Sequence, residues 1–153
     1  MADVVDYTFA RVWRMPSTTH LLGCQAQGSS LTLRIGNASG KFRNCIVVGN
    51  ANQNGPSGVG GDYVSKAIYT LCDVAGLTGA GCKTEADSAK VFKKPASGDY
   101  HLRSGSPAVN AGSNQDWMSD ALDLDGASRI FGRQVDMGCY EFPNGLGTVI
   151  FMQ

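Results

Sequence analysis

Three aspartates near the end of the chain have the residue type and spacing to bind a metal ion. Asp123 and Asp125 are separated by one leucine and precede Gly126, and Asp136 follows further along the chain. Carboxylate oxygens next to a glycine turn are typical of calcium loops, although the full twelve-residue EF-hand pattern is missing. The alternative is a tight turn in which these carboxylates accept hydrogen bonds from nearby backbone N–H groups. Both interpretations of Asp123, Asp125 and Asp136 stay open at this point.

Charged residues in the same region could also form a buried ion pair without any metal. Arg129 or Arg133 could pair with Asp136 or Glu141. Because a buried charge needs a partner of opposite sign, such a pair would fix the end of the chain as a cap.

Trp117 and two histidines are further side chains that could take part in binding. Trp117 lies in the polar stretch 113–121, where an exposed indole ring could stack on a sugar. A tryptophan that covers the edge of a core is the commoner case. His20 and His101 have no Cys or Asp partner at metal-ligand spacing, so we expect each of them to be a polar surface residue.

No motif of a common enzyme class is present. The sequence contains no GxSxG, HExxH, P-loop or CxxC pattern.

A short sequence phrase that occurs three times indicates a series of repeated strands. Cys24, Cys45 and Cys72 each precede a glycine by four residues, and they lie 21 and 27 residues apart. Apolar residues stand two positions after and three positions before them: Ala26, Val47 and Val74, and Leu21, Phe42 and Tyr69. Repeats on this length scale are typical of solenoids, so the pattern predicts a parallel β-helix with an inward column of cysteine thiols. The apolar residues three positions before the cysteines, Leu21, Phe42 and Tyr69, do not fit the two-residue period of a strand, so they predict a corner between consecutive strands.

Composition and charge indicate one globular domain. The chain has 153 residues, of which 42% are apolar, enough to fill one core. Basic and acidic residues number 13 each, so no net charge steers the protein towards nucleic acid. No apolar run approaches the roughly 18 residues of a membrane span, and residues 1–13 lack the basic and apolar regions of a signal peptide.

Two blocks in the C-terminal half resemble a known family. Residues 98–112 read GDYHLRSGSPAVNAG, and residues 123–142 read DLDGASRIFGRQVDMGCYEF. In this order they resemble the C-terminal end of secreted bacterial pectate-lyase-like right-handed β-helix proteins, in particular the choice-of-anchor Q family. The phrases NCIVVGN at 44–50 and AKVFKKPASGDYHL at 89–102 resemble the last rungs of that family. The resemblance covers roughly residues 40–142.

The resemblance implies an all-β fold, a right-handed parallel β-helix of about four rungs with a C-terminal cap. Residues 1–112 would form the rungs, and residues 113–153 the cap and tail, of a single domain that is a fragment of a longer secreted or cell-surface protein. The expected function is a noncatalytic structural or adhesive module with an extracellular polysaccharide or surface glycan as partner. The alternative is the C-terminal fragment of a polysaccharide lyase or glycoside hydrolase whose active rungs lie upstream.

The resemblance also allows a check for lyase chemistry. Pectate-lyase-like enzymes hold calcium against a uronate with stacked acidic residues, and an Arg or Lys removes the proton. The columns one and three residues after the cysteines carry Gln25, Ile46 and Asp73, and Gln27, Val48 and Ala75. Neither column is acidic, so the sequence predicts no stacked calcium site on that face. Lys94 and Arg103 are the basic residues whose mutation would test any lyase activity.

The N-terminal end of the predicted β-helix lacks a capping element. Residues 1–12 show no long amphipathic helix pattern, so the first rung would leave Val4, Val5 and Phe9 at an open edge. Two such edges can close on each other by two-fold docking, and we predict a homodimer through the N-terminal end.

Overall fold

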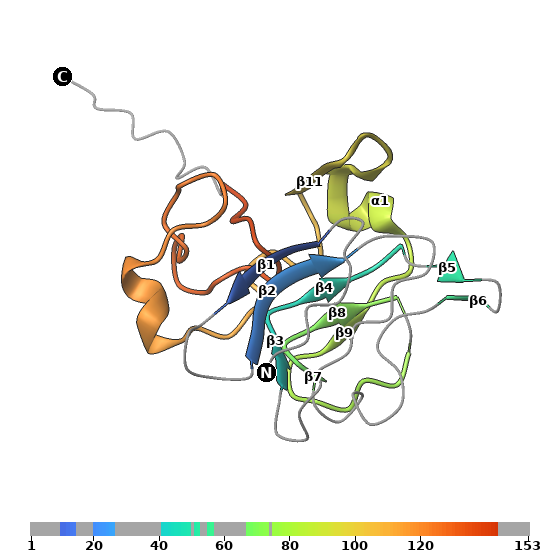
Figure 1. Ribbon diagram of the computed structural model, residues 1–153, viewed down its shortest axis with the longest axis horizontal. Helices are drawn as coiled ribbons and strands as arrows, with labels where there is room; N and C mark the ends of the chain where they lie inside the picture. The colour runs from blue at the N-terminus through green and yellow to red at the C-terminus, as the bar shows by residue number, and fades with distance from the viewer. Residues whose placement is uncertain are drawn as a thin grey trace.

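The computed structural model describes residues 10–14, 20–26, 41–49, 51–52, 55–56, 67–73 and 75–143, and the statements below concern these residues. Their strands form one larger sheet and two small ones (Figure 1). The larger sheet contains β1 (Ala10–Arg14), β2 (His20–Ala26), β3 (Lys41–Arg43), β4 (Ile46–Val47), β7 (Ala67–Ile68), β8 (Leu71–Cys72) and β9 (Lys83–Thr84).

The two small sheets are antiparallel pairs. One is formed by β5 (Ala51–Asn52) and β6 (Gly55–Pro56), and the other by β10 (Phe92–Lys94) and β11 (Asp99–Leu102). The helices are short: α1 (Ser88–Val91) and the 3-10 helices η2 (Pro95–Ser97) and η3 (Asp116–Asp120). None of the helices in the described ranges has the length and apolar character of a membrane span.

The prediction of a right-handed parallel β-helix is wrong. The strands are short and lie in three separate sheets that mix parallel and antiparallel pairs, and the described residues form no solenoid. The intervals between paired positions show why: Gln25, Ile46, Leu71 and Lys83 are neighbours across the larger sheet, and they are 21, 25 and 12 residues apart. Successive passes of the chain are therefore not equivalent turns, and β1 returns antiparallel onto β2.

The predicted corner between consecutive strands is confirmed after Phe42 but is wrong after Leu21, because β2 continues through Cys24 as one strand. The chain bends between β3 and β4 at Asn44, which has a φ of 54°, and between β7 and β8 at Tyr69, which has a φ of 48°. Gly81, before β9, has a φ of 67° and lies in the same column of the sheet. A Cβ atom on Gly81 would overlap the Tyr69 ring, so the two aligned corners also pack on each other.

The predicted cysteine column is wrong in its third member. The constant 21-residue offset between β2 and the β3–β4 pair places Cys24 beside Cys45, as expected. The next residue in that column is Thr70, whereas Cys72 pairs with Val47. The Thr70 hydroxyl makes the same kind of hydrogen bond as the Cys45 thiol. Cys45 Sγ donates to the Arg43 carbonyl at 3.3 Å, and Thr70 Oγ1 donates to the Ile68 carbonyl at 3.2 Å.

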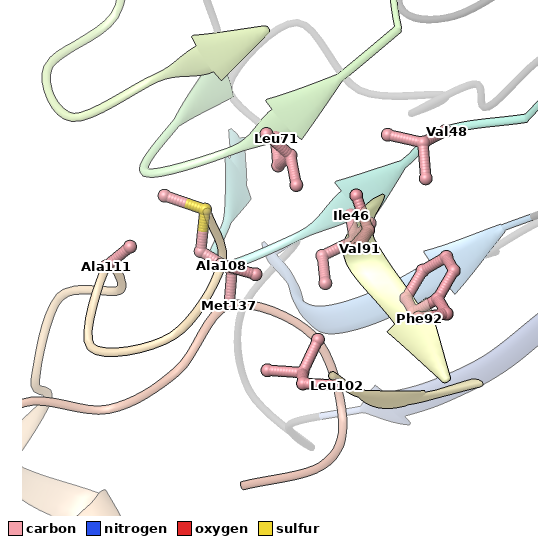
Figure 2. Close-up of a cluster of buried hydrophobic side chains, with 9 residues drawn as sticks. All are labelled: Ile46, Val48, Leu71, Val91, Phe92, Leu102, Ala108, Ala111 and Met137. Carbon is pink, nitrogen blue, oxygen red and sulfur yellow. The ribbon is translucent and has the colours of Figure 1, made fainter. Parts of the chain in front are cut away.

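The core lies between the larger sheet, the β10–β11 pair and residues 106–142, which we call the C-terminal segment. In Figure 1 this segment, orange to red, lies to one side of the sheet, and β10 and β11 lie to another. The buried side chains that meet there come from all three parts (Figure 2): Ile46, Val48, Leu71, Val91, Phe92, Leu102, Ala108, Ala111 and Met137.

The N-terminal edge predicted to form a homodimer, with Val4, Val5 and Phe9, lies outside the described residues. The same holds for residues 144–153, the last part of the predicted cap and tail.

Candidate functional site

Asn44 joins the larger sheet to the C-terminal segment. Its side chain is fully buried and makes two hydrogen bonds with the backbone of Ser113. Asn44 Nδ2 donates to Ser113 O at 3.0 Å, and Ser113 N donates to Asn44 Oδ1 at 2.7 Å. Gly138 N donates to the Asn44 carbonyl at 2.8 Å, so two stretches of the C-terminal segment meet at this one corner residue.

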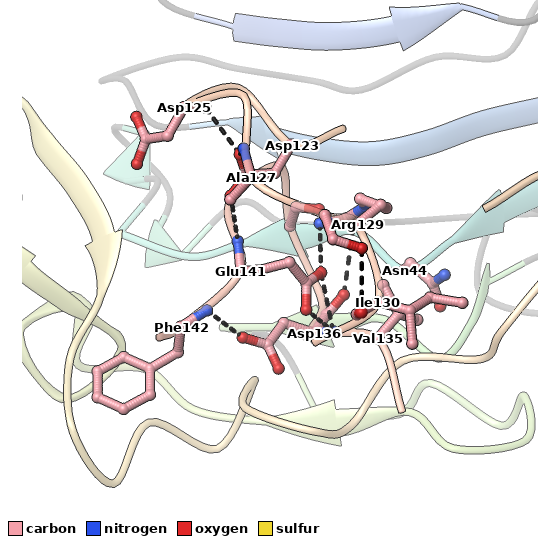
Figure 3. Close-up of polar contacts among 12 residues, drawn as sticks. Asn44, Asp123, Asp125, Ala127, Arg129, Ile130, Val135, Asp136, Glu141 and Phe142 are labelled. Atoms are coloured by element: carbon pink, nitrogen blue, oxygen red, sulfur yellow. Dashed lines mark hydrogen bonds and ion pairs between the residues drawn. The ribbon is translucent and has the colours of Figure 1, made fainter. Parts of the chain in front are cut away.

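A buried ion pair holds the C-terminal segment together (Figure 3). Arg129 Nη1 donates to Glu141 Oε1 at 2.7 Å, and Arg129 Nη2 donates to the carbonyls of Gly138 and Asp136 at 2.5 and 3.3 Å. Both side chains of the pair are almost fully buried. The predicted metal-free pairing is thus confirmed for Arg129 with Glu141, whereas the Arg133 side chain is exposed.

The carboxylates of Asp123 and Asp136 bind backbone N–H groups. Asp136 accepts from Asn110 N and Phe142 N, each at 2.6 Å. Asp123 Oδ1 accepts from the two turn residues Asp125 and Ala127, and Asp123 Oδ2 accepts from Glu141 N at 3.0 Å. The two aspartates therefore accept hydrogen bonds from backbone N–H groups, as the turn interpretation expected. Some of these N–H groups, such as those of Asn110 and Glu141, are far away in the sequence.

The third aspartate of the predicted calcium site points elsewhere. The Asp125 carboxylate lies away from Asp123 and Asp136 (Figure 3), and it contacts His101 instead. Over the described ranges, no group of three or more His, Cys, Asp or Glu side chains is placed to hold a metal ion.

The buried network contains three carboxyl groups but one guanidinium group. Burial, together with the carboxylates of Asp136 and Asp123, raises the pKa of Glu141 to about 8, against the opposing effect of Arg129. Burial also raises the pKa of Asp136 above its ordinary value. The network therefore favours holding a proton, because one positive charge cannot balance three buried negative charges.

We predict that the protein becomes less stable as the pH rises from about 5 to about 8. The folded state binds the Glu141 proton more tightly than the unfolded chain does, so the stabilisation is complete below the usual glutamate pKa and is lost as the pH rises through about 8. Melting temperature measured by circular dichroism across this range should fall, and a Glu141→Gln variant should flatten the dependence. A wild-type melting temperature that stays constant or rises would contradict the prediction.

His101 lies between two carboxylates on the surface. Its Nδ1 is 2.5 Å from Asp99 Oδ1 and its Nε2 is 2.9 Å from Asp125 Oδ2. Its ring also stacks on Tyr140, with the ring centroids 4.2 Å apart and the planes at 35°. The hydrogen bond from His101 lowers the pKa of Asp99. His101 is partly exposed, as expected of a polar surface residue, but it has two aspartate partners, and the sequence interpretation that it is isolated from any Asp is wrong.

One part of this cluster has a signal in the sequence. Asp99 and His101 are two residues apart in β11, so a strand places their side chains on the same face. Asp125 and Tyr140 come from the C-terminal segment, and local sequence gives no indication that they meet His101. The cluster joins β11 to that segment.

The cluster leaves no room between its two carboxylates. Carboxylates that act together on a glycosidic bond need room for the substrate between them. Here the imidazole of His101 fills the space between Asp99 and Asp125. Each carboxylate bonds one nitrogen of this imidazole, and the imidazole ring packs on the Tyr140 ring.

Within the described part of the chain, the other candidate residues from the sequence, Trp117, Lys94 and Arg103, share no hydrogen bond with His101 or its two aspartates. Trp117 is a half-buried residue of η3, next to the buried Met118. Lys94 is an exposed residue at the end of β10, and Arg103 follows β11 and donates from Nη1 to the Ala89 carbonyl at 2.8 Å.

Comparison of the chain with protein-family models, curated proteins and solved structures finds no match.

Proposed function

We propose that this chain is a noncatalytic structural or adhesive module of a secreted or cell-surface protein, and that it attaches to extracellular glycans. The observation that carries the proposal is the use of the charged residues in the C-terminal segment. Arg129, Asp123, Asp136 and Glu141 are buried, and they bond to one another and to the backbone. Buried charged groups that bond to one another and to the backbone stabilise the fold, and they are not placed to act on a substrate.

The resemblance of residues 98–112 and 123–142 to secreted bacterial proteins supports the location. The candidate lyase base Arg103 also fits the noncatalytic proposal. Its guanidinium donates to a backbone carbonyl, and a general base must instead accept a proton.

The test combines binding with a search for products. The protein is incubated with insoluble cellulose, chitin and calcium pectate gel, sedimented, and the supernatant is assayed for new reducing ends and for the ultraviolet absorbance of unsaturated uronides. We expect the protein to sediment with at least one of these glycans and to release no product.

Each contrary result has a distinct meaning. Unsaturated uronide that disappears in an Arg103→Ala or Lys94→Ala variant would overturn the noncatalytic proposal in favour of a lyase. A protein that stays in the supernatant with every glycan would overturn the adhesive proposal.

A further inference from the structure

We propose that the surface formed by Asp99, His101, Asp125 and Tyr140 is the glycan-binding site and that it selects neutral, hydroxyl-rich sugars over uronates. This inference rests on the proposed adhesive function, and it adds the place and the ligand class. We call this surface the His101 surface.

The His101 surface combines an aromatic platform with acceptors at fixed positions. The His101 ring lies over the Tyr140 ring, and the His101 side chain is 36% exposed. Aromatic faces of this kind bind the C–H faces of sugar rings, while polar groups at the edge set orientation. The ring pair spans two parts of the fold, because His101 belongs to β11 and Tyr140 to the C-terminal segment.

The two carboxylates leave acceptor oxygens available on opposite sides of the imidazole. Asp99 uses Oδ1 for both the ring and the backbone N–H of His101, and Asp125 uses Oδ2 for the ring. From within the described part of the chain, no hydrogen bond reaches Asp99 Oδ2 or Asp125 Oδ1. Their side chains are 34% and 53% exposed. A carboxylate accepts hydrogen bonds from sugar hydroxyls, and these two are held in place before a ligand arrives.

The charge of the surface decides the class of sugar. Asp99 and Asp125 place two carboxyl groups on either side of one imidazole, so acidic groups outnumber the histidine in this cluster, and the hydrogen bond from His101 lowers the pKa of Asp99. The nearby Lys93 also favours the ionised form of Asp99. A uronate would bring a third carboxylate to this surface and would be repelled, whereas neutral hydroxyls donate to the acceptors that are present.

Trp117 provides a matched control for the aromatic contribution. It is a half-buried aromatic residue of η3, and its position in a polar stretch made it the candidate sugar-binding residue of the sequence. Removal of Tyr140 and removal of Trp117 therefore distinguish the two places at which a sugar could stack.

The experiment uses the intact chain with soluble probes: cellohexaose, chitohexaose, mannohexaose and hexagalacturonate. Binding is followed by nuclear magnetic resonance shifts and by calorimetry for the wild type and for Tyr140→Ala, Asp125→Asn and Trp117→Ala. We expect a neutral oligosaccharide to bind at least tenfold more tightly than hexagalacturonate and to shift the His101 ring signals. Tyr140→Ala and Asp125→Asn should each weaken binding by about fivefold or more, because each removes one contact, and Trp117→Ala should leave binding unchanged.

The outcomes separate the inference from the proposal on which it rests. Binding that is lost in Trp117→Ala but kept in Tyr140→Ala, or tighter binding of hexagalacturonate, overturns the His101 surface and leaves the adhesive function standing. No binding of any glycan, soluble or insoluble, overturns both. Shifts of the His101 ring signals in the wild-type protein are read directly, so the result does not depend on whether Tyr140→Ala folds.

Discussion

Replacing Asn44 with alanine should lower the free energy of unfolding by roughly 2–4 kcal/mol. The side chain is fully buried and exchanges two hydrogen bonds with Ser113, so its loss leaves the Ser113 N–H and carbonyl without these partners. Asn44 also holds the left-handed conformation of the corner, with a φ of 54°, which alanine adopts less readily.

Asn114 offers a matched control of the same residue type. It too makes two side-chain hydrogen bonds with the backbone, from Nδ2 to Arg133 O at 2.9 Å and from Val135 N to Oδ1 at 2.8 Å. Asn114 and Arg133 are exposed, so water can replace the bond to the Arg133 carbonyl, whereas the Val135 N–H belongs to a buried residue. Asn114→Ala should therefore cost less than Asn44→Ala, roughly 1–2 kcal/mol. Urea unfolding of the two variants gives the comparison. Equal losses would show that burial at Asn44 contributes nothing.

A third variant separates the two roles of Asn44. Asn44→Gly removes the same two hydrogen bonds but keeps a residue that readily takes a positive φ. If the hydrogen bonds dominate, Asn44→Gly should be nearly as unstable as Asn44→Ala. If the backbone conformation dominates, the glycine variant should recover most of the lost stability.

The sequence predicted one part of the sheet and missed another for a physical reason. The 21-residue interval was correct, and so was the corner after Phe42, which the break in the two-residue period predicted. Asn44 makes that corner in a left-handed conformation, which asparagine tolerates. The same apolar column also predicted a corner before Cys72, and there Tyr69 itself makes the turn with a positive φ, which is uncommon for an aromatic residue. The repeated phrase aligned Cys72 with Cys45, whereas the sheet aligns Thr70 with Cys45. The predicted third strand was therefore displaced by two residues.

Local sequence likewise predicts only some of the contacts in the candidate sites. The Arg129–Glu141 pair could be predicted because buried charges need partners and few residues were available near the end of the chain. The His101 surface could not be predicted in full, because Asp125 and Tyr140 reach His101 only through the packing of the C-terminal segment. Periodicity reports local faces of strands, whereas contacts between distant loops depend on the complete fold.

Replacing Arg129 with methionine should have the largest effect of any single change, a loss of roughly 3–5 kcal/mol. The change removes the one positive charge that the described residues place among three buried carboxyl groups, and it removes the donors to the Gly138 and Asp136 carbonyls. Because the carboxyl groups can take up protons to relieve their repulsion, the loss should be smaller at about pH 5 than at about pH 8.

The double variant Arg129→Met with Glu141→Leu tests whether the loss comes from the charge left behind. Removing both members of a buried ion pair is often much less harmful than removing one. We expect the double variant to recover a substantial part of the stability lost in Arg129→Met. No recovery would indicate that the hydrogen bonds to the two carbonyls matter more than the ion pair.

The charged residues of the C-terminal segment hold the fold together from inside. Urea unfolding of Arg129→Met beside Arg133→Met at about pH 8 tests this role, because Arg133 is four residues away and its side chain is exposed. We expect a loss of several kcal/mol for Arg129→Met and a change within about 0.5 kcal/mol for Arg133→Met. Equal, small effects of the two substitutions would show that the buried charges do not stabilise the fold.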